Sequence, residues 1–229
     1  MEGRKKEKKL MLKSGCIMSL DEIIQEIYNF FQLKESIDRK RFKNSLYTDT
    51  YYDDEENSLL KSGGSLKLRD SVDNIGIRKQ TFIMRRKTSN PKKIKLEMLW
   101  EEAGVKTQYK EGDDFFKALS ALKGCFNDFD FSTIIPVKIL TCQTSRTEYR
   151  IQLKDECLVV LFDRIIYTSD QNTAKDSLVK LRTVGNVELM PLYEHLQKCF
   201  SDKYELIDMS RYERALYKLA QSEENGEDC

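Results

Sequence analysis

Hydrophobic residues near the start of the chain recur at the spacing of an amphipathic helix. Residues 19–22 read SLDE, the Ser-x-x-Glu pattern of a capping box, in which the two side chains bind each other's backbone N–H groups at a helix start. The apolar positions that follow are Ile23, Ile24, Ile27, Phe30 and Phe31. This spacing predicts a helix of about four turns.

Between residues 46 and 100 the period of the pattern changes to two, which is typical of β-strands. The alternating segments are 65–69 (SLKLR), 75–78 (IGIR) and 93–98 (KIKLEM). Residues that favour turns lie between them, at 63–64 (GG), 73–74 (DN) and 89–91 (SNP). Hairpins of an antiparallel meander are therefore predicted.

The second half of the chain repeats this organisation around one helix. A helical pattern at 113–126 is followed by strand patterns at 137–140, 147–153, 158–167 and 178–190, a helix behind Pro191 and a helix at 210–219. Two sets of strands, each closed by helix, predict an α+β fold: an antiparallel β-barrel with helices packed on the outside. We expect one domain at 1–221 and a disordered tail at 222–229.

The polar faces of the predicted strands are selectively cationic. The residues that alternate with apolar neighbours are Lys67 and Arg69; Lys93, Lys95 and Glu97; Arg146, Glu148 and Arg150; and Lys180 and Arg182. Two arrangements are open. The cationic faces can be solvated while the apolar faces pack on helices, or they can converge inside a barrel, where a bound polyphosphate would balance their charge.

Composition narrows the classes of function. The chain has 229 residues and a net charge of +1, so a basic surface for nucleic acid or membranes is not expected. It has no apolar run of roughly 18 residues and no signal-peptide pattern, which predicts a cytoplasmic protein. Six scattered cysteines without a C-x-x-C pair do not favour a zinc site or a disulfide framework. The lone His195 is interpreted as a surface or packing residue of a helix.

Several blocks resemble one known family. Residues 46–54 (LYTDTYYDD) and 58–69 (SLLKSGGSLKLR) are similar to the Tyr-Tyr-Asp-Thr strand and the Leu-Arg-x-Arg segment of the CYTH family. These proteins are triphosphate tunnel metalloenzymes and include inorganic triphosphatases, thiamine triphosphatases and class IV adenylyl cyclases. Residues 75–78 (IGIR), 186–189 (NVEL) and 210–216 (SRYERAL) resemble further family segments. The resemblance covers nearly the whole chain.

Two positions depart from the family pattern. The family's first strand carries Glu-x-Glu-x-Lys, and the best match here is residues 5–12 (KKEKKLML), which keep Glu7 and Lys9 but have Lys5 at the first glutamate. Asn186 replaces one glutamate of a later pair and leaves Glu188. Both changes remove a charge that the family uses to hold metal.

The resemblance implies a role for each candidate site residue. The predicted phosphate contacts are Lys9, Lys67, Arg69, Arg78, Lys95, Arg146, Arg182 and Arg211. The predicted catalytic acids are Glu7, Glu97 and Asp163, and the predicted metal ligands are Glu7 and Glu188. For Asp163 a second interpretation is open, because an Asp-Arg step is as typical of a turn or a surface ion pair. Mg²⁺ or Mn²⁺ is the implied cofactor, which would polarise a phosphoryl group for attack.

The predicted function is metal-dependent hydrolysis of inorganic tripolyphosphate or a small organic triphosphate. Two alternatives remain open: an adenylyl cyclase of the same fold, and a noncatalytic module that binds polyphosphate or nucleotide, which the altered first strand favours. The expected partner is a triphosphate-containing small molecule. No nucleic-acid partner is expected other than an RNA 5′-triphosphate end, and the chain is expected to be a monomer or homodimer without a membrane association.

Overall fold

The computed structural model describes residues 6–12, 19–72, 78–86, 92–99, 137–153, 156–170, 172–184, 188–205 and 209–224. Within these ranges, the side chains of residues 6–12, 82, 84–86, 92–99, 184, 204–205 and 223–224 lie outside the description. The predicted helix at 113–126 and residues 75–77 of a predicted strand also lie outside the described residues.

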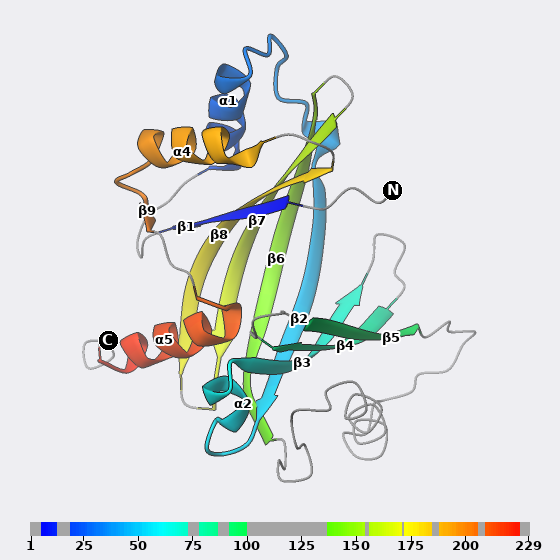
Figure 1. Cartoon of the computed structure of the whole chain (residues 1–229), viewed down its shortest axis with the longest axis vertical. Helices are drawn as coiled ribbons and strands as arrows, with labels where there is room; N and C mark the ends of the chain where they lie inside the picture. The colour runs from blue at the N-terminus through cyan, green and yellow to red at the C-terminus, as the bar shows by residue number, and fades with distance from the viewer. Residues whose placement is uncertain are drawn as a thin grey trace. The chain divides into compact units, whose positions relative to one another are not determined.

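Long strands and a few helices make up the described chain (Figure 1). In chain order they are β1 (Lys6–Leu12), α1 (Leu20–Phe30), the 3₁₀ turn η1 (Arg39–Arg41), β2 (Lys43–Asp53), α2 (Ser58–Lys61), β3 (Gly64–Val72), β4 (Arg78–Arg86), β5 (Lys92–Leu99), β6 (Val137–Leu153), β7 (Glu156–Thr168), β8 (Thr173–Val184), α4 (Leu189–Cys199), β9 (Tyr204–Glu205) and α5 (Arg211–Glu224). The predicted α+β class with an antiparallel sheet and packed helices is confirmed.

The strands form one sheet, in the order β5-β4-β3-β2-β6-β7-β8-β1-β9. The pairs β1–β8, β1–β9, β2–β3, β3–β4 and β4–β5 are antiparallel. Among the described residues the hydrogen-bonded order ends at β5 on one edge and at β9 on the other. Closure of the sheet into a barrel therefore stays a prediction.

The chain divides into two compact units, and each draws on separate parts of the sequence. Unit 1 contains Met1–Asn44, Ser145–Ile165 and Lys175–Asp208. Unit 2 contains Ser45–Thr144, Ile166–Ala174 and Met209–Cys229. This division leaves the expectation of a single domain at 1–221 as a prediction.

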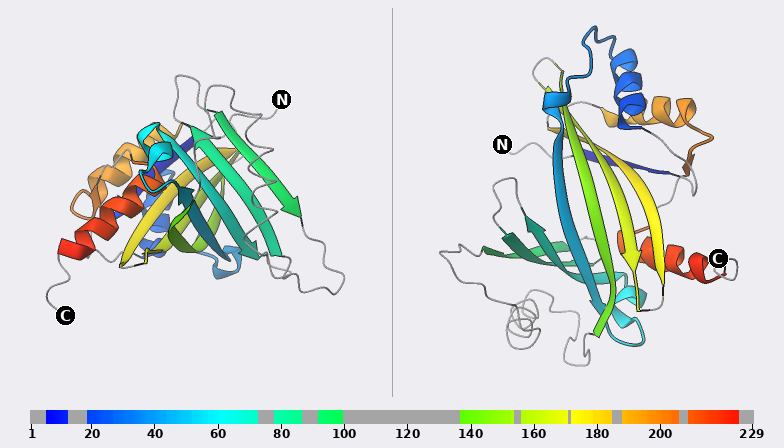
Figure 2. Two further views of the ribbon diagram at one scale, coloured as in Figure 1. Left: turned by 90° about the horizontal axis from the view of Figure 1, so that it is seen from below. Right: turned by 180° about the vertical axis from the view of Figure 1, so that it is seen from behind.

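In unit 1, helices α1 and α4 lie side by side against one face of the strands (Figure 2). The Ser19 hydroxyl accepts from the Glu22 N–H at 3.2 Å, and the Ser19 N–H donates to the Glu22 carboxylate at 2.9 Å, which confirms the predicted capping box. The helices bury apolar side chains against β7 and β8. This core includes Ile23, Ile24, Ile27, Val160, Phe162, Val179, Leu181, Leu192 and Leu196.

The opposite faces of the same strands carry buried charges. Asp163 is fully buried, Lys180 is 8% exposed, and the side chain of Arg146 is 15% exposed. The sequence pattern alone is compatible with cationic faces that are solvated and with cationic faces that are buried. The burial of these three residues supports buried charges at their positions.

In unit 2, a buried carboxylate joins β2 to two helices. Asp53 accepts from the N–H groups of Leu59 and Leu60 at the start of α2, at 2.9 and 3.0 Å, and from the Tyr212 hydroxyl of α5 at 3.3 Å. Gly63 has φ 73° directly after α2, a backbone conformation that glycine adopts without a Cβ clash. The buried face of α5 includes Tyr212, Ala215 and Leu219.

Three predicted boundaries near the end of the chain are wrong. The strand predicted at 178–190 ends at Val184 as β8, and α4 begins at Leu189 rather than behind Pro191. Helix α5 continues to Glu224, so residues 222–224 are helical and do not begin a tail. None of the helices in the described ranges is long and apolar enough to cross a membrane.

Candidate anion-binding site

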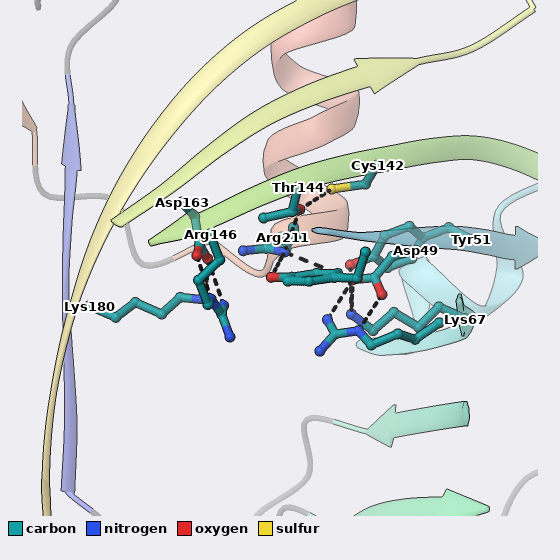
Figure 3. Close-up of polar contacts among 11 residues, drawn as sticks. Asp49, Tyr51, Lys67, Cys142, Thr144, Arg146, Asp163, Lys180 and Arg211 are labelled. Atoms are coloured by element: carbon teal, nitrogen blue, oxygen red, sulfur yellow. Dashed lines mark hydrogen bonds and ion pairs between the residues drawn. The ribbon is translucent and has the colours of Figure 1, made fainter. Parts of the chain in front are cut away.

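The centre of the candidate site in unit 2 is Asp49, a fully buried residue of β2 (Figure 3). Arg69 of β3 lies directly opposite it and donates from Nε to Oδ1 at 2.6 Å and from Nη2 to Oδ2 at 2.8 Å. The Lys67 Nζ donates to Asp49 Oδ2 at 2.5 Å. Because strand side chains alternate, Lys67 and Arg69 share one face of β3 and reach the same carboxylate. We call Asp49, Lys67, Arg69 and Arg211 the Asp49 cluster.

Arg211 joins the cluster from the first turn of α5. Its Nη1 donates to Tyr47 Oη at 3.0 Å and to Thr144 Oγ1 at 3.2 Å, and it lies 3.9 Å from Asp49 Oδ2. A second capping box fixes this end of α5: the Ser210 hydroxyl accepts from the Glu213 N–H at 3.2 Å, and the Ser210 N–H donates to Glu213 at 2.6 Å. The capping box of residues 210–213 (SRYE) thus fixes the position of Arg211 in the first turn of α5.

Tyrosine rings pack around the cations. The Arg69 guanidinium lies 4.0 Å from the centre of the Tyr47 ring, and the Lys67 Nζ lies 3.4 Å from Tyr51 Oη. The Tyr51 ring stacks on Tyr212 of α5, with centroids 5.0 Å apart and planes 8° from parallel. These rings hold the cations in place and shield them from water, which strengthens their attraction for an anion.

The Asp49 cluster carries more positive than negative charge. With Lys67 protonated, Lys67, Arg69 and Arg211 contribute three cations and Asp49 one carboxylate, which leaves an excess of two positive charges; the excess falls to one when Lys67 loses its proton. Burial, together with the charges of Arg69 and Arg211, lowers the pKa of the Lys67 ammonium to about 7, although the negative charge of Asp49 acts to raise it. Burial would raise the pKa of Asp49, but the Arg69 hydrogen bond and the Lys67 charge hold it well below its usual range. A buried excess of this kind attracts a polyanion.

Unit 1 contains a second carboxylate with the same two types of partner. Asp163 of β7 accepts from Arg146 of β6, Nε to Oδ1 at 2.6 Å and Nη2 to Oδ2 at 2.8 Å. Lys180 of β8 donates to Oδ2 at 3.1 Å. Three adjacent strands therefore supply this second cluster (Figure 3).

The structure brings together three of the predicted phosphate contacts, Lys67, Arg69 and Arg211. Arg78 does not join them. It pairs across the ladder with Val72 and ion-pairs with Asp70 at the exposed surface, so it lies on the opposite face of β3 and β4 from Lys67 and Arg69.

The other predicted phosphate contacts are less fully described. Arg146 is held by Asp163, and Arg182 is a half-buried residue of β8. The backbone register pairs Lys9 with Lys180 and Lys95 with Ile83, while the Lys9 and Lys95 side chains lie outside the described residues.

The predicted acids do not assemble a metal site in the described part of the chain. Asp163 is not available as a metal ligand because its two oxygens accept from Arg146 and Lys180. Glu188 is an exposed residue at the start of α4, not part of a strand. Glu7 pairs with Arg182 and Glu97 with Thr81 in the register, but their side chains lie outside the described residues.

Sequence reasoning missed Asp49 and Lys180 as central residues. Asp49 lies within the family-like block at 46–54, where it alternates with Tyr47 and Tyr51. That spacing places Asp49 on the same face of β2 as the two tyrosines. A lone acid there, across the β2–β3 pair from Lys67 and Arg69, is the signal that could have identified it. Lys180 shows the same cationic alternation as Arg182.

Comparison with known proteins gives matches among solved structures. A candidate adenylate cyclase from Bacillus halodurans is 16% identical, with 92% of this chain and 97% of that chain covered and a TM-score of 0.49. The PH1819 protein from Pyrococcus horikoshii is 16% identical, with 93% and 99% covered and a TM-score of 0.48. HpAC1 from Hippeastrum, a candidate adenylyl cyclase with a dominant triphosphatase activity, is 11% identical, with 92% and 94% covered and a TM-score of 0.49.

No family model and no curated protein matches the chain. Identities this low do not define an activity, which depends on the residues of the site itself.

Proposed function

We propose that this protein acts on a phosphoanhydride bond, as a triphosphatase that holds a linear triphosphate at the Asp49 cluster. The observation that carries the proposal is the convergence of Lys67, Arg69 and Arg211 on a single buried carboxylate. Three cations gathered by two separate elements would repel one another, and one aspartate offsets only part of that charge. The phosphate oxygens of a triphosphate supply the remainder.

The cluster suits phosphate in geometry as well as in charge. A guanidinium has more N–H donors than the two that Arg69 gives to Asp49, and its planar fork matches two phosphate oxygens. Asp49 orients Arg69 and Lys67, so the cations are positioned before the substrate arrives. Positioned cations of this kind stabilise the negative charge of a phosphoryl group during its transfer.

Dependence on Mg²⁺ or Mn²⁺ belongs to the proposal, but the described carboxylates do not fit such an ion. Asp49 and Asp163 both face cations, which would repel a divalent metal. Of the predicted metal ligands, Glu188 is an exposed residue at the start of α4, so Glu7 is the acid that remains for this role. We therefore propose Glu7 as a metal ligand and derive no catalytic step through the metal.

The same observation supports a second candidate, a noncatalytic module that binds polyphosphate or nucleotide. Saturation of Asp49 and Asp163 by cations leaves the described part of the chain able to bind phosphate without metal. Such a module would bind tripolyphosphate with strong salt dependence and release no product.

Phosphate release from tripolyphosphate, thiamine triphosphate, ATP and triphosphorylated RNA, with Mg²⁺ or Mn²⁺, tests the proposal. We expect turnover of at least one substrate by the wild type and a loss of roughly tenfold to a hundredfold in Arg211→Gln, the range for one charge-assisted hydrogen bond. Arg150→Gln is the matched control, because Arg150 is exposed and pairs with Glu148.

The products separate the alternatives. Cyclic AMP and pyrophosphate from ATP would identify a cyclase, and orthophosphate a hydrolase. Binding of tripolyphosphate without turnover under any divalent ion would contradict the triphosphatase and support the binding module. Equal rates for the wild type and Arg211→Gln would contradict the binding of the triphosphate at the Asp49 cluster.

A further inference from the structure

Three side chains of unit 1 with metal-binding atoms meet where α1 packs against α4. Cys199 Sγ lies 3.5 Å from His195 Nε2 and 3.8 Å from Glu26 Oε2. His195 Nε2 lies 3.5 Å from the same Glu26 oxygen. Among the described residues, this is the group in which three such donors come within reach of one ion.

The helices determine this arrangement. His195 and Cys199 are four residues apart on α4, so they lie on one face of the helix about one turn apart. Glu26 comes from α1, and 173 positions separate it from Cys199 in the sequence. Sequence spacing alone therefore does not favour a zinc site, and only the packing of the two helices brings the third donor to the pair.

The separations match those of a tetrahedral zinc site. Zinc binds histidine nitrogen and carboxylate oxygen at about 2.0–2.1 Å and thiolate sulfur at about 2.3 Å, which at tetrahedral angles places the donors about 3.3–3.6 Å apart. The observed separations of 3.5, 3.5 and 3.8 Å are within a few tenths of an ångström of those values. Small side-chain rotations would complete the geometry.

Neighbouring residues hold two of the three donors. Asn29 donates from Nδ2 to Glu26 Oε1 at 3.3 Å, which directs the other oxygen, Oε2, toward His195 and Cys199. Gln25 in turn donates to Asn29 at 3.2 Å. The Phe30 ring packs on the His195 ring, with centroids 5.2 Å apart. Support of this kind around the ligands is typical of metal sites.

We propose that Glu26, His195 and Cys199 bind a thiophilic divalent cation of the Zn²⁺ type, with water as the fourth ligand. Cys199 is exposed, which leaves a side of the site open to that water. Because a thiolate is the ligand, the cation displaces the Cys199 thiol proton to solvent when it binds. The ion links α1 to α4, and this role is independent of triphosphate chemistry.

A titration of the full chain with Cd²⁺ under a non-thiol reductant tests the site, because a sulfur-to-cadmium charge-transfer absorbance reports thiolate ligation. We expect one Cd²⁺ per chain, displaced by Zn²⁺, and a rise in the thermal midpoint of unfolding with Zn²⁺. Cys199→Ser should abolish the absorbance. His195→Gln and Glu26→Gln should each weaken binding at least about tenfold. A loss of that size is typical even when the mutated residue only hydrogen-bonds to a metal ligand.

Cys157→Ser is the matched control, because Cys157 is another free thiol of unit 1, and it should bind Cd²⁺ as the wild type does. Circular dichroism of the metal-free variants checks that each is folded. An unchanged absorbance in Cys199→Ser would overturn the proposal. So would unchanged affinity in both His195→Gln and Glu26→Gln, which would mean that a single thiol binds the ion.

Discussion

Asp49 controls the charge of its cluster at the scale of single residues. It is fully buried and accepts hydrogen bonds from both Lys67 and Arg69, so it offsets part of a repulsion that would otherwise separate them. A carboxylate in this position has two consequences. It stabilises the fold while the site is empty, and it leaves a positive excess for an anion.

Replacing Asp49 by Asn should destabilise the chain by about 3–5 kcal/mol, because the change leaves the buried Lys67 and the half-buried Arg69 without their counter-charge. Urea unfolding with and without tripolyphosphate measures this, and the ligand should restore more stability to Asp49→Asn than to the wild type. Asp70→Asn, which removes the partner of the exposed Arg78, should cost less than about 1 kcal/mol. Equal losses in the two variants would contradict the role given to Asp49.

Lys67 should make anion binding depend on pH. Its pKa falls from 10.5 to about 7 in the folded chain, so between these values the unfolded chain holds more protons at Lys67, and its contribution to stability rises with pH. A bound phosphate favours the protonated ammonium, so binding at pH 8 should take up a proton.

Calorimetry in two buffers of different ionisation enthalpy measures that uptake, which should disappear in Lys67→Met. The other shifted groups of the site stay in one form near pH 8: the pKa of Asp49 is lowered, and those of Arg69, Cys142 and Tyr212 are raised. Buffer-independent heats for the wild type would contradict the assignment.

At the scale of elements, local patterns predicted the type of most segments but not every boundary. The capping box at Ser19 identified the start of α1, because its signal lies within four residues. The strand pattern predicted at 178–190 ends in β8, and its last residues belong to α4, where Leu189 is buried along with Leu192 and Leu196 at helical spacing. A few apolar residues at the end of a pattern fit either structure, and only tertiary contacts decide between them.

The capping box of α5 should matter for binding as well as for stability. Ser210→Ala removes the hydroxyl that caps the turn carrying Arg211, which should cost about 0.5–2 kcal/mol and weaken tripolyphosphate binding. Ser19→Ala removes the equivalent cap of α1 and should cost about the same stability without changing affinity. Urea unfolding and calorimetric titration of both variants compare them, and equal affinities would contradict the positioning of Arg211 by α5.

At the scale of the whole molecule, a net charge of +1 hides strong local charge. Strand alternation predicted cationic faces, and burial of Lys67 and Lys180 shows that part of these faces is withdrawn from water. Alternation could not predict which cation meets which acid. That depends on the register between strands, which places Arg69 opposite Asp49 and places Arg78 on the other face.

The most direct test is calorimetric titration of tripolyphosphate into the wild type, Arg69→Gln and Arg78→Gln without divalent ions. The wild type should bind one tripolyphosphate with an affinity that falls as salt rises, because the contacts are between charges. Arg69→Gln should bind roughly tenfold to a hundredfold more weakly, and Arg78→Gln should bind as the wild type does. Equal affinity in all three proteins, or a loss in Arg78→Gln alone, would contradict an anion site at the Asp49 cluster.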